Sequence, residues 1–364
     1  MAAAPQYLRI VVNAEHRYGL WPFARRIPPG WVDTYFVGSR LRCLAQITEL
    51  TRQHGPEPAA STGGSPDDGG RTVTGRLDLV TALAPRRAAV LGAGRPLTFA
   101  GLDRRAGALA RTIAEHGVRP GELVGLRLRP GADAVVARLA VLRAGAAYLP
   151  MRDGSPPAQP GLRLIVAEPE WAGPARRHGL PVLAWKRRDR AGGRRPARAG
   201  RAVEPGDPAY VVPGPAPGGG LVFDHGRLVL AATATYSAGG PLPTGGPAEC
   251  AAPSPECDEL VIWGQLLHGD PVRFDGQAVA APSGAGDPDE LDGRWYVLDD
   301  DLHPVTEGQL YFAAAWLGGG YRGGPTRTAR WLRPDPFDRT GGRTMLWTGH
   351  RARRVDGVLR LADP

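Results

Sequence analysis

The sequence predicts an α/β protein that carries a smaller α+β module at its N-terminus. Residues 77–183 alternate between amphipathic helical segments and short apolar β-rich runs, which is typical of a parallel sheet flanked by helices. Residues 6–50 instead combine three β-rich runs with one helical segment, which predicts a small three-stranded antiparallel sheet plus a helix. Residues 54–75 are rich in Pro, Gly, Ser and Asp and predict a flexible linker between the two parts.

The N-terminal module is expected to begin with a strand over 7–12, a polar turn at 13–16 and a second strand near 18–21. A turn at 28–30 leads into the third strand. Ser39 is a candidate N-cap for the helix that follows. A module this small buries little apolar surface and gains stability from a partner. The predicted apolar stripe of its helix consists of Leu41, Leu44, Ile47 and Leu50.

The larger part is predicted element by element in the same way. A turn at 117–121 and a strand over 123–128 precede an apolar helix over 132–142. Strands over 295–298 and 309–312, with an acidic turn after the first, are expected to pair antiparallel. Low-order stretches are expected at about 186–206 and 276–293. An earlier helix is predicted by the stripe Leu102, Ala106, Leu109 and Ile113.

The charge of the chain is strongly positive, with a formal net charge of +9 and a pI of about 10.0. Lys186 is the only lysine, so the positive charge is almost all arginine. The one dense basic run, 186–201, has no interleaved aromatic residues of the kind that stack on bases. We therefore interpret it as a solvated loop and predict no nucleic-acid partner.

Cysteine usage and hydropathy indicate a cytoplasmic protein without a metal site. Cys43, Cys250 and Cys257 form neither a pairing framework nor a close metal-ligand spacing, so free thiols are expected. No run of about twenty apolar residues exists, which predicts no membrane span. The first residues lack a basic region followed by a long apolar core, and no secretion signal is expected.

The N-terminal module holds an ordered set of aromatic, glycine and proline residues that resembles the MbtH-like proteins, which are partners of adenylation enzymes. The resemblance implies that two tryptophans flank a surface cleft that grips an adenylation domain. On their own, the same tryptophans would be interpreted as core aromatics. Residues 51–56 depart from the pattern, which implies that the module closes differently. Its predicted bounds are 1–53. The residues that carry the resemblance are Asn13, Glu15, Tyr18, Leu20, Trp21, Pro22, Pro28, Gly30, Trp31, Gly38, Cys43, Leu44 and Ile47. The implied partner-binding residues are Leu20, Trp21, Pro22, Pro28 and Trp31.

The remainder resembles, in pieces, the adenylation domains of nonribosomal peptide synthetases. The matching segments are 96–121, 139–150, 309–337 and 347–359. The resemblance predicts that 76–364 is a truncated adenylation-like domain: an N-terminal subdomain without the C-terminal subdomain that supplies a catalytic lysine.

The loop that should cradle the phosphates of ATP is degenerate. Such a site needs backbone amides, hydroxyls and cations, and the resembled family uses a Thr/Ser/Gly loop that ends in Pro-Lys-Gly. The matching residues 213–220 contain no hydroxyl and no lysine, and their prolines donate no amide hydrogen. Gly218, Gly219 and Gly220 are its only phosphate-binding candidates, and a glycine triplet is usually just a turn. We therefore expect no cofactor.

Further positions of the resembled family are altered. His350 stands where an aspartate holds the ribose hydroxyls, and an imidazole accepts one hydrogen bond at most. Asp258 lies near the position of the aspartate that holds the substrate amino group, but a capping or surface carboxylate is the favoured interpretation. The motif that contacts adenine and magnesium is absent from the sequence.

The leading hypothesis is a non-catalytic accessory or scaffold protein of nonribosomal peptide biosynthesis. Its partners would be a synthetase adenylation domain, bound through the MbtH-like module, and a carrier protein. The module would dock within its own chain or on a separate synthetase. Pro334 stands where the resembled family presents an alanine to the tryptophan cleft, which favours a separate partner. The alternative is a repurposed enzyme that acts without ATP on a carrier-bound aminoacyl group through His225, Asp258 and His350.

Overall fold

The computed structural model divides into two compact units, and each is described here by itself. Unit 1 comprises Met1–Ala60, Pro243–Ala252 and Leu291–Pro364, and unit 2 comprises Ser61–Leu242 and Pro253–Glu290. The residues that the structure describes are 7–54, 71–92, 95–151, 161–176, 179–185, 202–213, 220–237, 255–275, 278–279, 293–314, 317, 320, 324–355 and 358–361.

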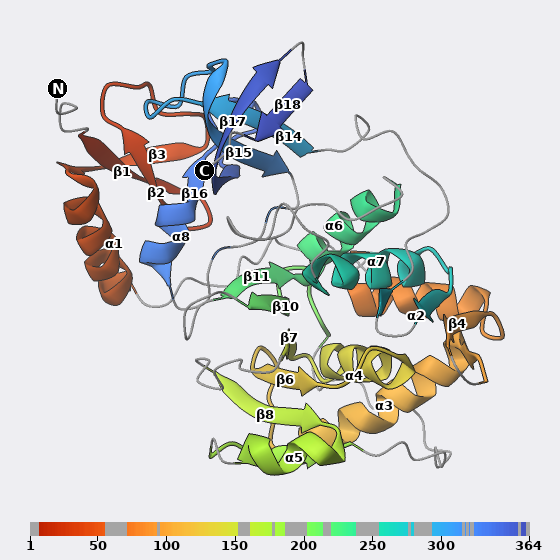
Figure 1. The fold of residues 1–364 in the computed structure, drawn as a ribbon. Coiled ribbons are helices and arrows are strands. Elements are labelled where there is room, and N and C mark those ends of the chain that lie inside the picture. Colours follow the sequence, from red (N-terminus) through yellow and green to blue (C-terminus); the bar gives the residue numbers. More distant parts are fainter. Residues whose placement is uncertain are drawn as a thin grey trace. The chain divides into compact units, whose positions relative to one another are not determined.

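Unit 1 begins with the predicted small sheet and helix. The sheet has the order β2-β1-β3, and both pairings are antiparallel. Side chains alternate between its two faces along each strand, so that the sheet presents one apolar face to α1 and another apolar face away from it. These elements, red in Figure 1, are β1 (Leu8–Asn13), β2 (Tyr18–Pro22), β3 (Trp31–Gly38) and α1 (Arg40–His54).

The predicted stripe of α1 is wrong at one position. Leu41 is 81% exposed, whereas Cys43 and Ile47 are completely buried against the sheet. Steps of three residues rotate the stripe by about 60° each around a helix of 3.6 residues per turn. Residues 43, 47 and 50, which are four and three positions apart, lie on one face of the helix, and this is the face that is buried.

The C-terminal strands of unit 1 form an antiparallel sheet of order β14-β15-β17-β16, with β18 paired to β17. The predicted antiparallel pair is confirmed, and Trp295 lies opposite Phe312 in the register. Figure 1 draws these elements in blue. They are β14 (Gly293–Leu298), β15 (Glu307–Ala314), α8 (Pro325–Trp331), β16 (Leu332–Pro334), β17 (Thr344–Val355) and β18 (Val358–Leu361).

Unit 2 is built on a six-stranded sheet of order β11-β10-β7-β6-β8-β9. Every pairing in it is parallel except that of β10 with β11, which confirms the predicted parallel sheet. Its strands are β6 (Leu123–Arg127), β7 (Ala147–Pro150), β8 (Leu162–Ala167), β9 (Val182–Ala184), β10 (Pro208–Pro213) and β11 (Gly220–Asp224). A second sheet of order β13-β12-β4-β5 contains β4 (Ala88–Leu91), β5 (Leu97–Thr98), β12 (Val272–Asp275) and β13 (Ala278–Val279).

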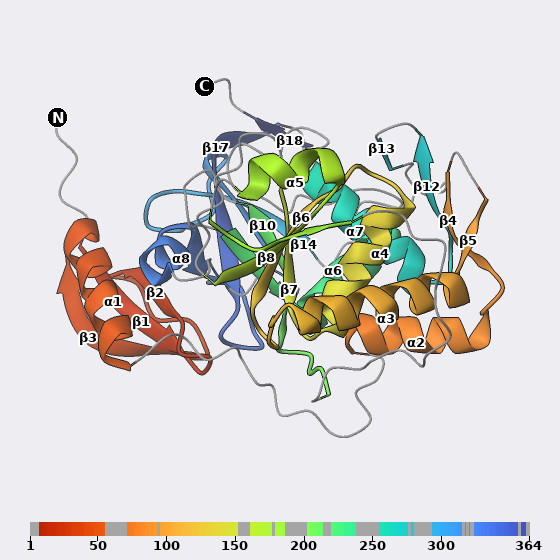
Figure 2. The ribbon, with the colours of Figure 1, turned by 90° about the horizontal axis from the view of Figure 1, so that it is seen from below.

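Helices complete unit 2 (Figure 2). The predicted face of α3 is buried, and α3 packs against α4. Thr72 caps α2 by accepting a hydrogen bond from Gly75 N at 3.0 Å, so α2 begins inside the segment predicted as a linker. The helices are α2 (Val73–Leu83), α3 (Phe99–Glu115), α4 (Ala132–Arg143), α5 (Pro169–Arg176), α6 (His225–Ser237) and α7 (Pro255–Leu267).

A buried polar network ties α4, α7 and β7 together in unit 2. Arg138 Nε donates to both carboxylate oxygens of Glu259, at 2.9 and 2.8 Å. Tyr148 Oη donates to Glu259 Oε2 at 2.9 Å and accepts from Trp263 Nε1 at 2.7 Å. The side chain of Glu259 is 2% exposed. The network therefore satisfies a charged pair in the interior of the unit.

The two units of the structure are made of other segments than the predicted domains. The predicted boundaries are 1–53, 54–75 and 76–364, but the strands from β14 onward group with the N-terminal module rather than with 73–279. Sequence composition detects linkers along a chain and carries no signal for which distant segments meet. In the described part of the chain, no helix has the length and apolar character needed to cross a membrane.

Candidate partner-binding site

Trp21 and Trp31 lie on the face of the N-terminal sheet that points away from α1. Trp21 is completely buried and Trp31 is 6% exposed. The surface around Gly19, Trp21 and Trp31 is called the tryptophan cleft below. It is covered by residues of β14, β15, β17 and the turn after β14, all from the same chain. The apolar cluster around the two tryptophans contains Val11, Leu298, Leu302, Tyr311, Ala313 and Met345.

Pro334 of β16 lies in the tryptophan cleft. A Cβ atom added at Gly19 would be 2.9 Å from Pro334 Cδ and 3.2 Å from Trp31 Cζ3. The absence of a side chain at Gly19 thus makes room for the proline ring between β2 and Trp31. This chain thus places one of its own residues in the cleft, and the preference for a separate partner, which rests on Pro334, stays a prediction.

Asn13 closes the turn between β1 and β2 and reaches across to the C-terminal part of unit 1. Its Oδ1 accepts hydrogen bonds from the backbone N atoms of Glu15 and Arg17, at 3.1 and 2.9 Å. Its Nδ2 donates to Gly342 O at 3.1 Å. One buried side chain thus fixes the local turn and a contact with a residue 329 positions later.

Two glycine-containing loops approach each other closely beside the tryptophan cleft. Gly342 N donates to Pro29 O at 2.9 Å. A Cβ atom at Gly30 would lie only 2.3 Å from Gly342 N, and Gly30 has φ +75°. Both the conformation and the backbone-to-backbone approach therefore require glycine at this position.

Asp338 organises the loop that reaches Gly30. Its Oδ1 accepts from Thr340 N and Thr340 Oγ1 at 2.9 and 2.6 Å, and its Oδ2 accepts from Gly341 N and Arg343 N at 2.8 and 3.1 Å. Burial alone would raise the pKa of Asp338, but the hydrogen bonds, led by those of Thr340, outweigh burial and lower it. The carboxylate is therefore the form that this loop stabilises.

The five predicted partner-binding residues are all buried, but they do not form a single surface. Leu20 follows the alternation of β2 onto the opposite face from Trp21, where it packs with α1 and with Ala329 of α8. On that side Thr48 Oγ1 lies 2.6 Å from Thr326 Oγ1. The tryptophan cleft and the α1 side are thus two separate contacts with the C-terminal part of unit 1.

Arg25 is a further contact residue that the sequence did not single out. Its Nη1 donates to Asp301 O at 2.9 Å, and its guanidinium carbon lies 5.6 Å from the centre of the Trp21 ring. Trp21 Nε1 donates to Arg25 O at 3.2 Å. The pair combines cation–π and hydrogen-bond contacts at the edge of the cleft. Arg25 is one of many evenly spread arginines, and no sequence pattern distinguishes it.

His225, one of the three catalytic candidates, is completely buried at the start of α6. Among the described residues, neither of its ring nitrogens has a hydrogen-bond partner. Burial lowers the pKa of His225 to about 4, although the negative charge of Asp207 acts in the opposite direction. The imidazole is therefore neutral at neutral pH and faces protein rather than solvent.

This neutral histidine is expected to make unit 2 sensitive to acid. The unfolded chain binds a proton near pH 6.5 and the folded chain only near pH 4, so stability is lost as pH falls through that window. Between pH 7 and pH 5 the loss is about 2 kcal/mol. Urea unfolding of wild type and His225→Leu at both pH values checks this, and the variant is expected to lack that loss. The exposed His116 supplies the control His116→Leu; equal pH dependence in all three proteins would contradict the prediction.

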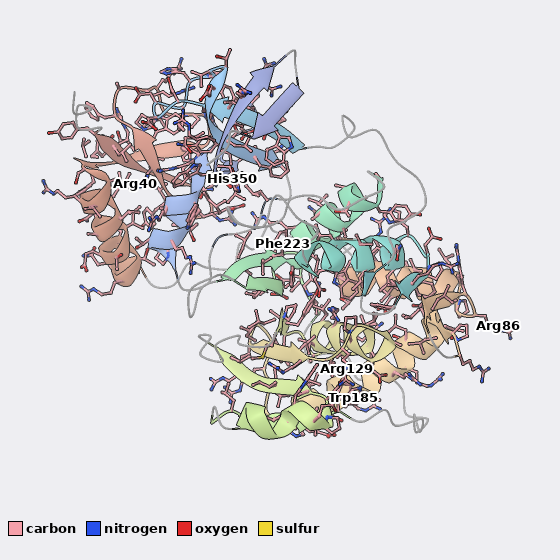
Figure 3. All side chains as sticks on the ribbon, in the orientation of Figure 1. Arg40, Arg86, Arg129, Trp185, Phe223 and His350 are labelled. Carbon is pink, nitrogen blue, oxygen red and sulfur yellow. The ribbon has the colours of Figure 1, made fainter. Side chains whose placement is uncertain are left out.

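The remaining candidates are not brought together with His225 in the described residues. Asp258 lies in α7, but its side chain is outside the described part of the structure. His350, labelled in Figure 3, belongs to unit 1 and lies on β17. Its Nε2 is buried without a hydrogen-bond partner among the described residues. Gly218 and Gly219 lie outside the described residues, and Gly220 is the first residue of β11. These site assignments stay predictions.

His350 also bears on whether a nucleotide fits the chain. By resemblance it is predicted to stand at the ribose position, where its imidazole would accept too few hydrogen bonds to replace a carboxylate. In the described segments, no group of three His, Cys, Asp or Glu side chains is placed to hold a metal ion. We therefore derive no reaction step that depends on a nucleotide or on a metal ion.

Two family models match separate segments of the chain. The model for MbtH-like proteins matches residues 4–59, and the model for AMP-binding enzymes matches residues 79–170. Tyrocidine synthase 3 of Brevibacillus parabrevis is 33% identical over 110 residues, which cover 30% of this chain and 2% of that protein. Phosphinothricin tripeptide synthetase PhsC of Streptomyces viridochromogenes is 37% identical over 123 residues, which cover 34% of this chain and 10% of that protein. The chain thus spans at most a tenth of the length of these two relatives.

Among solved structures, the N-terminal subdomain of Klebsiella oxytoca NpsA has a TM-score of 0.60 and 16% identity. The match covers 80% of this chain and 99% of that one, and at this identity it shows the fold. Together these findings support both predicted resemblances. The chain joins an MbtH-like segment to a segment with the fold of the N-terminal subdomain of adenylation domains.

Proposed function

We propose that this chain is a non-catalytic accessory protein of nonribosomal peptide biosynthesis, in which the MbtH-like module supports an adenylation-like domain through the tryptophan cleft. The observation that carries the proposal is the occupied cleft: Trp21 and Trp31 are buried against β14–β17 of the same chain, with Pro334 beside Gly19. An MbtH-like cleft filled by an adenylation-like strand is the contact that this role requires.

The proposed role does not include formation of an aminoacyl adenylate. Residues 213–220 contain no hydroxyl and no lysine that could neutralise the leaving pyrophosphate. ATP–pyrophosphate exchange with each amino acid is expected to stay at background, beside a working synthetase adenylation domain as the positive control. Exchange above background with any amino acid would refute this part of the proposal.

The proposed partners are a synthetase adenylation domain and a carrier protein. One structure similar to this chain is titled an artificially fused adenylation–PCP di-domain of Klebsiella oxytoca, which supports testing a carrier domain as well. The full chain is co-expressed with adenylation and carrier domains of a nonribosomal peptide synthetase. Co-purification and the exchange rate of the synthetase domain are then measured.

The variants link the partner to the tryptophan cleft. Because the cleft is filled by strands of the same chain, Trp21→Ala combined with Trp31→Ala is expected to disrupt the packing of unit 1 and thereby to abolish co-purification and the increase in exchange rate. Tyr35→Ala removes an aromatic side chain from the same module that is 89% exposed, and it is expected to change neither. If the double variant binds and activates as wild type does, the cleft has no part in the function and the proposal fails.

A further inference from the structure

A cavity of about 240 Å³ lies within unit 1, between the N-terminal module and the C-terminal strands. Its lining includes Arg40, at the start of α1, and Arg333, on β16 (Figure 3 labels Arg40). Each arginine comes from one of the two parts of the unit. Asp300 is the one carboxylate among the described lining residues, and it is an exposed residue.

Arg333 is a buried cation that has no counter-charge among the described residues. It is 8% exposed, and within the described segments its side chain forms no hydrogen bond or ion pair. Burial lowers the pKa of Arg333 to about 10, and the positive charge of Arg40 acts in the same direction. A buried guanidinium that is repelled by a second one is costly unless an anion joins them.

Arg40 packs against an aromatic ring. Burial and the positive charge of Arg330 lower its pKa, and the negative charge of Asp300 acts in the opposite direction to a smaller extent. The guanidinium carbon of Arg40 lies 5.4 Å from the centre of the Trp347 ring. Its Nη2 is buried and has no hydrogen-bond partner among the residues described. Each of the two arginines therefore keeps at least one guanidinium donor without a partner among the described residues.

Neutral donors complete the lining. Gln309 Oε1 accepts from Trp347 Nε1 at 3.0 Å, which leaves the amide hydrogens of Gln309 for another acceptor. Burial raises the pKa of Tyr311, so its hydroxyl keeps its proton at neutral pH. Two guanidinium groups, an amide and a phenol make a surface that selects for an acceptor with several negative oxygens.

We propose that this cavity binds a small tetrahedral oxyanion such as phosphate between Arg40 and Arg333. The planar fork of each guanidinium matches two oxygens of such an ion. The volume has room for roughly eight water molecules, which suits a free ion and is below the usual size of pockets for larger ligands. Because one arginine comes from α1 and the other from β16, the bound ion would also strengthen the contact between the two parts.

The test is thermal unfolding of the full chain in phosphate and in sodium chloride of equal ionic strength. Phosphate is expected to raise the unfolding temperature of wild type more than chloride does, as ligand binding to the folded state requires. Phosphate also stabilises proteins non-specifically, so the readout is the difference between wild type and variants. Arg333→Met is expected to lose the specific rise and, without phosphate, to be at least as stable as wild type.

Matched variants make the outcome decisive. Arg40→Met is expected to lose the same rise, which keeps the test valid if Arg333→Met does not fold. Arg25→Met removes a contact between the same two parts outside the cavity, and it should unfold at a lower temperature but keep the phosphate response. An equal phosphate response in wild type and in both cavity variants would overturn the proposal. A larger response to adenosine monophosphate than to phosphate would overturn the assignment to a free ion.

Discussion

Glu259→Gln is expected to lower the free energy of unfolding of unit 2 by about 3–5 kcal/mol, because it leaves the charge of Arg138, whose side chain is only 15% exposed, without a counter-charge. The carboxylate accepts from Arg138 Nε with both oxygens and also from Tyr148 Oη. Neither the amide oxygen nor the amide nitrogen of Gln restores that arrangement. Guanidinium unfolding, together with hydrogen exchange of peptides from α4 and α7, measures the loss in this unit.

Two comparisons separate the loss of charge from a loss of packing. The double variant Glu259→Gln with Arg138→Met removes both charges and should recover most of the stability. Glu122→Gln breaks an ion pair whose arginine, Arg163, is 64% exposed, and it should cost about 0–1 kcal/mol. A loss from Glu259→Gln as small as that of Glu122→Gln would contradict the buried-pair account.

Trp21→Ala is expected to lower the free energy of unfolding of unit 1 by about 3–5 kcal/mol, the range for removal of a fully buried aromatic side chain. The variant also loses the hydrogen bond to Arg25 O. Since β15 and β17 pack over this ring through Tyr311 and Met345, peptides from those strands should exchange their amide hydrogens faster.

Leu41→Ala is the control for Trp21→Ala, since Leu41 belongs to the same module and is 81% exposed. Its effect should stay within about 0.5 kcal/mol. If Trp21→Ala accelerates exchange only in β1, β2 and β3, the C-terminal strands do not depend on the tryptophan. The contact between Trp21 and the C-terminal strands would then contribute little to the stability of unit 1.

Local patterns in the sequence predicted the elements well. The run at 123–128 and the helix at 132–142 are recovered as β6 and α4 because strand and helix periodicity record which face is buried. The predicted stripe of α1 is wrong at Leu41, since a constant three-residue step drifts around the helix instead of following one face. The start of α2 was missed because the single hydroxyl of Thr72 caps it inside a polar segment.

The site could be predicted only in part. The pattern around Trp21 and Trp31 indicated a binding cleft, but nothing local shows that residues about three hundred positions later fill it. The cavity arginines Arg40 and Arg333 were missed for the same reason: each is one arginine among many until the fold brings the two together. Catalytic candidates chosen by resemblance carry no information on burial, and His225 is completely buried.

The apolar cluster around Trp21 has a consequence for the order in which the chain folds. Met345 is made 324 residues after Trp21 (345 − 21), and both belong to this cluster. At about 5–20 residues per second, the ribosome takes roughly 16–65 s to add that stretch. The face of the N-terminal sheet that carries Trp21 therefore stays uncovered while most of unit 2 is synthesised. Unit 2 can fold during this time. During translation the N-terminal sheet is a natural substrate for chaperones, and the earliest segment of the chain is among the last to reach its final packing.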